Sequence, residues 1–198
     1  MAQIFAYIVH KDGVADDTAL ELVVAAKKLD ASVDAIAVVT GSGAELDTVC
    51  NDVAASYKEV YKIDNEALAY PNAEVVRKAL VNVLPADGIV LVPHTTFGMD
   101  LGPGLSIKMD SAFVADAVDF EGVDGSTLKV VRQEFGGQVS AHMECDISGG
   151  AVINVRPGPF LPTKARVQVD RSWINQVMLV TWQLVANTWK SSFRKLVM

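Results

Sequence analysis

The stretch of sequence that decides the fold is Asp87-Gly88-Ile89-Val90-Leu91-Val92-Pro93-His94-Thr95-Thr96-Phe97-Gly98-Met99-Asp100. Its apolar run, 89–92, stands between a glycine and a proline, which is typical of a strand buried on both faces. Thr95 or Thr96 can cap the helix that follows, because a hydroxyl accepts a free backbone N–H group. Pro103 implies that this helix starts after Thr96 or kinks. A strand that leads straight into a capped helix is the unit of a parallel α/β sheet.

Three similar units precede this stretch. Strands are predicted from apolar runs at 4–9, 33–39 and 59–63. Helices are predicted to begin at Asp16 or Asp17, after Gly41-Ser42-Gly43, and at Asn72. Alternating strands and helices with short connections imply a parallel sheet with helices on both faces, which is a three-layer architecture.

The rhythm changes after Met109. Strands are predicted at 113–120, 128–135, 139–145 and 151–155, with no long helix between them. The glycine pairs at 136–137 and 149–150 indicate antiparallel hairpins. Arg156-Pro157-Gly158 ends this region, and its proline and glycine suit the central positions of a type II turn. The sequence therefore predicts an α/β fold with a mostly parallel sheet and an antiparallel hairpin extension.

Bulk properties exclude several classes of protein. The 198 residues are 51% hydrophobic, which is enough for a substantial core. The net charge of −7 disfavours a nucleic-acid or anionic-membrane partner. No apolar run is long enough to cross a membrane, and the N-terminus does not resemble a signal peptide. Cys50 and Cys145 have no metal-binding spacing and are expected to be reduced core residues, which favours a cytoplasmic location.

The C-terminal segment 171–198 differs from the first 170 residues. It has no acidic residue, four basic residues and all three tryptophans of the chain. One interpretation is a basic, apolar helix that packs on the domain or on a partner. Such a helix could also join two copies of the chain, because an exposed apolar patch of this size is rare on monomers. The other interpretation is an out-of-frame translation. The chain is therefore divided into a domain at 1–170 and an atypical tail at 171–198.

Two places could bind a phosphate. Gly41-Ser42-Gly43 lies between a strand and a helix, as a dinucleotide-binding loop does. It follows the second strand rather than the first, and Leu46 occupies the third glycine position, so a helix-capping turn is favoured. Thr95 and Thr96 could donate hydrogen bonds to a phosphate, although plain capping is again favoured.

No catalytic or metal-binding group of residues is evident. His10, His94 and His142 lack the spacing of a metal site. His94 ends a central strand, where ligands bind in α/β folds, but no partner for it can be assigned. The four acidic residues between 110 and 121 form no acid–base pair. Arg156 could bind a substrate carboxylate, but a salt bridge within the domain or between subunits is favoured.

Four blocks of sequence resemble one family, the electron transfer flavoprotein α subunit, in its N-terminal domain. They are Val92–Leu101, Asp110–Asp116, Gly136-Gly137 with the strand after it, and Val155–Phe160. The blocks fall in the family's order and spacing. The resemblance covers about residues 1–165.

This resemblance implies an adenine-nucleotide-hydrolase-like, Rossmann-like domain that is followed in the family by a domain that binds FAD. A β subunit of similar fold completes the heterodimer, which carries electrons from acyl-CoA dehydrogenases in the cytoplasm of bacteria. The N-terminal domain is a scaffold that packs on the β subunit. Interface or structural roles are therefore expected for five residues: His94, Phe97, Arg156, Pro157 and Gly158.

The sequence departs from the family after about residue 170, where the family continues into its FAD domain. The resemblance then implies an electron-carrier subunit that is not an enzyme, binds no FAD by itself and is redox-inactive alone. A frameshift that truncates the FAD domain would explain the tail. An alternative function is that of a stand-alone nucleotide-binding protein like a universal stress protein, based on the strand–helix rhythm and Gly41-Ser42-Gly43.

Overall fold

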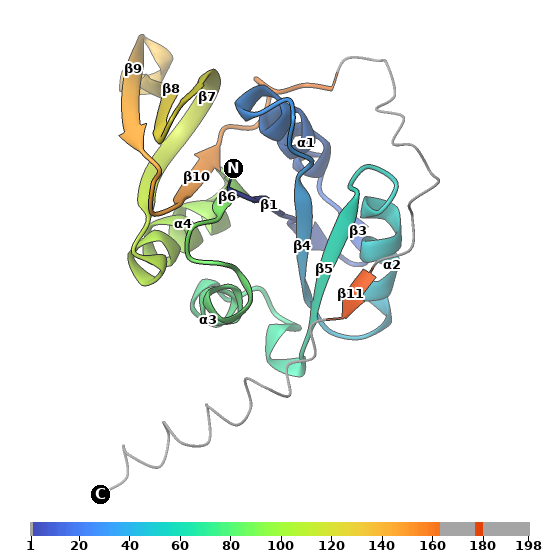
Figure 1. The fold of residues 1–198 in the computed structure, drawn as a ribbon. Helices are drawn as coiled ribbons and strands as arrows, with labels where there is room; N and C mark the ends of the chain where they lie inside the picture. The colour runs from blue at the N-terminus through green and yellow to red at the C-terminus, as the bar shows by residue number, and fades with distance from the viewer. Residues whose placement is uncertain (1, 163–176, 180–198) are drawn as a thin grey trace, which may run out of the picture.

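The computed structural model describes residues 2–162 and 177–179, which form an α/β fold around one large sheet (Figure 1). Within these residues the sheet has nine strands in the order β11-β5-β4-β1-β6-β10-β7-β8-β9. The strands are β1 (Ile4–Tyr7), β4 (Ile36–Gly41), β5 (Glu59–Asp64), β6 (Ile89–Pro93), β7 (Ala112–Asp124), β8 (Thr127–Glu134), β9 (Val139–Asp146), β10 (Ala151–Val155) and β11 (Val177–Leu179). The helices are α1 (Thr18–Leu29), α2 (Ala44–Val53), α3 (Ala73–Val83) and α4 (Thr96–Met109). A small hairpin, β2 (His10–Lys11) with β3 (Val14–Ala15), and two short 3₁₀ turns, Glu66–Leu68 and Phe135–Gly137, complete the fold.

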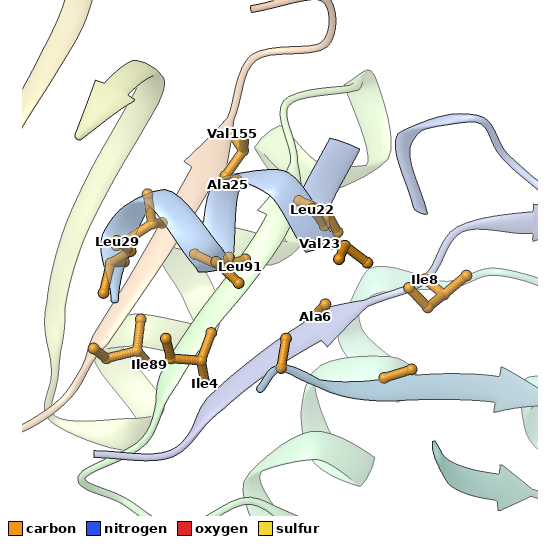
Figure 2. Close-up of a cluster of buried hydrophobic side chains, with 14 of the residues drawn as sticks. Ile4, Ala6, Ile8, Leu22, Val23, Ala25, Leu29, Ile89, Leu91 and Val155 are labelled. Carbon is orange, nitrogen blue, oxygen red and sulfur yellow. The ribbon is translucent and has the colours of Figure 1, made fainter. Parts of the chain in front are cut away.

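The sheet separates two apolar cores, because successive residues of a strand point to opposite faces. On one face, Ile4 and Ala6 of β1 and Ile8 just after it share a core with α1 (Figure 2) and α2. On the other face, Phe5 and Tyr7 pack against α3 and α4. Strands β1, β4, β5 and β6 are all parallel. The predicted three-layer, mostly parallel fold is confirmed.

Strand β6 and helix α4 follow the deciding stretch closely. All five residues of β6 are buried, as predicted for a central strand. The helix begins at Thr96, so of the two alternatives predicted from Pro103, a later start or a kink, the later start is excluded. The Oγ1 atom of Thr95 accepts a hydrogen bond from the Gly98 N–H at 3.2 Å and so caps the first turn. With its start fixed in this way, α4 continues through Pro103, whose ring removes one backbone hydrogen bond.

The glycines of α4 are required by close packing. A β-carbon at Gly98 would lie 1.9 Å from the carbonyl oxygen of Pro93. At Gly102 it would lie 2.4 Å from Oδ1 of Asn154. At Gly104 it would lie 1.7 Å from a guanidinium nitrogen of Arg77, on α3. The helix can therefore approach the sheet only because Gly98 and Gly102 have no side chain, whereas at Gly104 the flexible end of Arg77 could move aside.

Strand β10 corrects one prediction. Its residues were expected to form an antiparallel hairpin, but β10 lies between β6 and β7 and is parallel to both. All five side chains of β10 are buried. A strand without an exposed face cannot sit at an edge, and its side chains are covered only in the middle of the sheet.

The antiparallel extension is confirmed for β7, β8 and β9. These three strands form the end of the sheet beyond β10 (Figure 1). Strand β7 has two register shifts against β8, whereas β8 and β9 pair without a shift over eight residues. Cys145 lies on β9 and is only partly buried, so the prediction of a core position holds for Cys50 alone.

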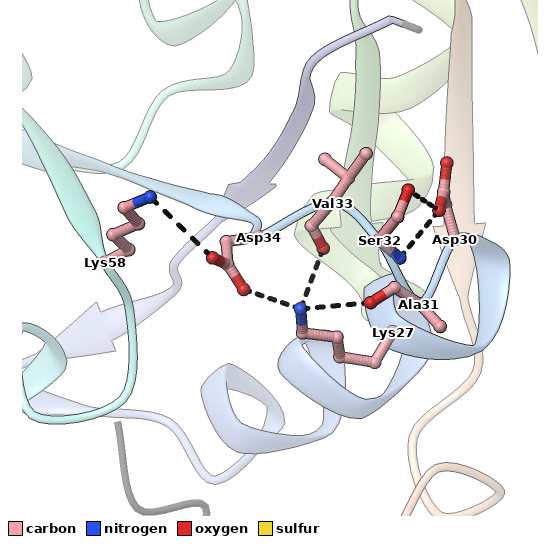
Figure 3. A network of polar contacts seen from close by, with 7 residues as sticks. All are labelled: Lys27, Asp30, Ala31, Ser32, Val33, Asp34 and Lys58. Atoms are coloured by element: carbon pink, nitrogen blue, oxygen red, sulfur yellow. Dashed lines mark hydrogen bonds and ion pairs between the residues drawn. The ribbon is translucent and has the colours of Figure 1, made fainter. Parts of the chain in front are cut away.

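Polar contacts close the turn between α1 and β4 (Figure 3). The Lys27 ammonium donates to the carbonyl of Val33 at 3.1 Å and forms an ion pair with Asp34. Lys58 lies 4.0 Å from the same carboxylate. The Asp30 carboxylate accepts two hydrogen bonds from Ser32, which hold the pKa of Asp30 below its usual value. These contacts hold the turn that leads from the end of α1 to the start of β4 in one conformation.

Strand β11 tests part of the prediction that the C-terminal segment 171–198 is a helix. Residues 177–179 pair with β5 in parallel, so these three residues are a strand and not part of a helix. The other tail residues, including Trp173, Trp182 and Trp189, lie outside the described residues. In the part of the chain that the structure describes, no helix is long and apolar enough to cross a membrane.

Candidate functional site

The carboxyl ends of β6 and β10 and the neighbouring part of β7 bring together His94, Asp116 and Arg156. His94 follows β6, Arg156 follows β10, and Asp116 lies on β7. The backbone holds them in place, because the N–H of His94 donates to Val155 at 2.7 Å and that of Arg156 to Ala117 at 2.9 Å. The carboxyl edge of a parallel sheet is where α/β folds place their ligand sites.

Asp116 and Arg156 form a bidentate ion pair. Nε of Arg156 donates to Oδ1 at 2.7 Å and Nη2 to Oδ2 at 2.6 Å. This hydrogen bonding lowers the pKa of the Asp116 carboxyl and raises that of the guanidinium. Asp116 has a φ of +61°, a left-handed conformation that aspartate tolerates better than most residues, next to the register shift between β10 and β7. The ion pair thus holds a strained bulge in one geometry.

His94 lies beside this pair without a close hydrogen bond to it. Its Nε2 is 3.7 Å from Oδ1 of Asp116. Its Nδ1 is buried and has no hydrogen-bond partner among the described residues. The sequence analysis assigned His94 no partner and so missed Asp116. The sequence indicated this partner only through the unusual position of Asp116, a charged residue between two alanines in a strand of apolar residues. The proximity arises because β10 inserts between β6 and β7.

The other residues predicted from this stretch serve the fold locally. Thr95 is the cap of α4, and Thr96 is its first residue. The Phe97 ring stacks on Tyr7 with centroids 5.9 Å apart. The Tyr7 hydroxyl in turn lies 2.9 Å from the hydroxyl of Thr40, and burial raises the pKa of Tyr7 to about 12. The cap uses the Thr95 hydroxyl only as an acceptor, so its O–H group can still donate a hydrogen bond.

The turn after β10 is tied to a helix on the opposite side of the sheet from α4. The N–H of Gly158 donates to the Glu21 carboxylate of α1 at 2.6 Å. Gly158 has a φ of +104°, as the predicted turn requires of its glycine. Two residues later, Phe160 packs on Phe120 with ring centroids 5.5 Å apart. Glu21 is buried and was not singled out from the sequence.

The Gly41-Ser42-Gly43 loop lies on the far side of β1, away from His94. Gly43 precedes α2 with a φ of +77°, and its N–H donates to Asp64 of β5 at 3.3 Å. Lys62 binds Asp64 at 3.2 Å and Asp47 at 2.6 Å. A phosphate at this helix start would meet two carboxylates in the place where a nucleotide loop offers free N–H groups. The residues present do not fit the pyrophosphate of FAD here.

The described residues contain no group of three side chains that could hold a metal ion. The guanidinium of Arg156 is engaged by Asp116, and within residues 2–162 and 177–179 no serine or cysteine is hydrogen-bonded to the His94 side chain. A half-open cavity lies at the opposite, amino-terminal edge of the sheet, beside Leu29 and Ile147, far from every residue predicted to bind a ligand.

Comparison with protein families matches residues 4–177 to the electron transfer flavoprotein domain. The chain belongs to this family. The resemblance drawn from its four sequence blocks is therefore confirmed.

Curated members of the family are distant relatives of this chain. The electron transfer flavoprotein subunit alpha of Clostridium acetobutylicum is 25% identical over 163 residues, which are 79% of this chain and 48% of that protein. The probable mitochondrial subunit alpha of Cryptococcus neoformans var. grubii is 25% identical over 154 residues, 76% of this chain and 40% of that protein. Protein FixB of Clostridium saccharobutylicum is 30% identical over 106 residues, 52% of this chain and 31% of that protein. The chain spans less than half the length of these relatives.

Proposed function

We propose that this chain is the scaffold domain of an electron transfer flavoprotein α subunit. In this role it pairs with a β subunit and supports FAD-mediated electron transfer from acyl-CoA dehydrogenases, without binding FAD by itself. The observation that carries the proposal is the family match over residues 4–177, together with two relatives named as α subunits.

The internal contacts of the predicted site support a structural role. Arg156 and Asp116 bind each other, and Gly158 binds Glu21, so the turn after β10 is held rigidly at the carboxyl edge of the sheet. A rigid surface favours pairing with another subunit, because fewer side chains lose freedom on binding. The carboxylates around Gly43 oppose a bound nucleotide there.

The pairing is tested by co-expressing the full chain with an electron transfer flavoprotein β subunit and purifying through a tag on one of them. We expect a one-to-one complex, and a chain without visible flavin absorbance when it is purified alone. Arg156→Gln should weaken the complex, since it frees the turn, whereas Lys129→Gln, on the exposed Lys129–Glu144 pair, should not. A yellow chain with stoichiometric FAD would contradict the proposal.

The alternative of a stand-alone nucleotide-binding protein makes an opposite prediction. It predicts that calorimetric titration with ATP or AMP shows binding to the wild-type chain, whereas the scaffold proposal predicts none, because Asp64 occupies the start of α2. Asp64→Asn removes a carboxylate that would repel a phosphate at the start of α2, so any nucleotide binding should be easier to detect in this variant. Micromolar binding that Asp64→Asn strengthens would favour the alternative function over the scaffold.

A further inference from the structure

The half-open cavity at the amino-terminal edge of the sheet has a volume of about 670 Å³. Its floor is apolar, because Ile4 of β1, Leu29 of α1 and Ile89 of β6 line it, and these three side chains lie together in Figure 2. The volume is in the range of pockets that bind small molecules, about 300–1,000 Å³. The cavity can therefore hold a small molecule with an apolar body.

The turns that form the walls of this cavity are held by hydrogen bonds of their own. The turn after α1 is closed by Asp30, whose carboxylate accepts two hydrogen bonds from Ser32 (Figure 3). The turn between β9 and β10 is joined to the turn between β7 and β8, because the N–H of Ile147 donates to the carbonyl of Ser126 at 2.8 Å. The cavity is thus formed before any ligand binds, as ligand pockets usually are.

The charged groups that line the cavity are all acidic. Asp30, just after α1, and Asp87, just before β6, both line it, whereas its described lining contains no lysine, arginine or histidine. Hydrogen bonds from Ser32 hold the pKa of Asp30 below its usual value, so this carboxylate is ionised at neutral pH. Helix α1 ends at Leu29, so the negative end of its dipole also lies at the cavity. The electrostatics of the cavity therefore favour a cation.

The two lysines in the last turn of α1 belong to other ion pairs. Lys27 pairs with Asp34, and Lys28 pairs with Asp119 on β7. Neither lysine lines the cavity. The two carboxylates at the cavity are therefore not matched by a basic side chain of its described lining, and a bound cation would supply the missing charge.

We propose that this cavity binds an organic cation, a primary amine with a compact apolar body. The ammonium group pairs with the carboxylates of Asp30 and Asp87, and the apolar body covers the floor of the cavity. An anion of the same shape is repelled by the carboxylates, and a neutral molecule of that shape gains only the apolar contact. The site does not depend on the scaffold role, because it lies at the opposite edge of the sheet from His94 and Arg156.

The charge preference is tested by calorimetric titration of the full chain with three probes of similar shape: phenethylamine, phenethyl alcohol and phenylpropionate. We expect the amine to bind one-to-one with a Kd below about 2 mM and the alcohol to bind at least about threefold more weakly, because it lacks the charge. Phenylpropionate should not bind detectably. A Kd of the amine above about 2 mM, or an alcohol or acid that binds within about threefold of the amine, overturns the proposal.

The place of binding is tested by two lysine variants with the same change in net charge. Val123 lines the cavity and is 40% exposed, so Val123→Lys puts an ammonium group at the site without opening the core. This variant should bind phenethylamine at least about tenfold more weakly. Val14→Lys, at a valine that is 65% exposed and outside this cavity, is the matched control and should change the affinity by less than about twofold. Circular dichroism melting checks that both variants fold, and equal effects of the two variants overturn the proposal.

Discussion

Strands β9 and β10 follow each other in the chain and have opposite places in the sheet. Strand β10 lies between β6 and β7 with all five side chains buried. Strand β9 is the outermost strand, and six of its eight residues are exposed. Their sequences differ in one respect, because Ala151–Val155 is apolar except for Asn154, whereas Val139–Asp146 alternates apolar and polar residues. A strand that is apolar on both faces is buried in the middle of the sheet, whereas a strand with one apolar face can lie at the edge.

The exception in β10 supports this conclusion. Asn154 is fully buried, and its Nδ2 donates to the carbonyl of Gly98 at 2.9 Å. Gly102 leaves the space that its side chain occupies. A single polar residue is therefore accommodated inside the sheet because α4 supplies both an acceptor and room, whereas the four polar residues of β9 require solvent or a partner.

The largest expected difference between the two strands is in the cost of truncating a side chain. Ile153→Ala should lower the free energy of unfolding by about 2–5 kcal/mol, because it opens a cavity in the fully buried β10. Urea denaturation monitored by circular dichroism measures this cost. A loss under about 1 kcal/mol at an unchanged m-value would show that β10 is not held in the core as described.

The contact between β10 and α4 should give the next largest effect. Gly102→Ala places a β-carbon 2.4 Å from Oδ1 of Asn154 and 3.0 Å from the Phe113 ring, so we expect a loss of about 1–3 kcal/mol. The double variant Gly102→Ala/Asn154→Ala should lose less than the sum of the two single variants, since truncating Asn154 removes the oxygen that the new β-carbon would meet. Strict additivity in the same denaturation experiment would argue against this contact.

The ion pair that joins β7 to the end of β10 should make stability depend on pH. Arg156 lowers the pKa of Asp116, so its stabilisation is present above the unfolded pKa, about 3.9, and is lost as pH falls through the lower folded value. Asp116→Asn, which keeps a residue tolerant of positive φ, should cost about 1–2 kcal/mol at pH 7, allowing for the partial exposure of Arg156. The difference between wild type and variant should shrink in acid. A difference that stays constant from pH 7 to about pH 3 would exclude the ion pair as its cause.

The smallest effect is expected on β9. Met143→Ala should change the stability of the chain by no more than about 0.5 kcal/mol at low protein concentration, because this side chain is partly exposed. Measured beside Ile153→Ala, it gives the contrast between edge and centre directly. A cost as large as that of Ile153→Ala would mean that β9 is covered within the monomer.

The strand–helix units were predictable because their signals are local. The apolar run at 89–92 and the Thr95 cap gave β6 and α4 nearly residue by residue. The place of β10 was not predictable in the same way, because glycine pairs on either side resemble hairpin turns and pairing partners are set by long-range contacts. The candidate site was unpredictable for the same reason, since His94, Asp116 and Arg156 come together only because β10 lies between β6 and β7.

The sequence by itself determined the family and the alternation of strands and helices, because motifs, caps and apolar periodicity depend on neighbouring residues alone. Only the tertiary structure decided which strand is central, which is an edge, and which carboxylate faces Arg156 or Gly43. These relations join residues 21 to 137 positions apart in the chain. They depend on how the whole sheet buries its apolar faces, and no short stretch of sequence records that.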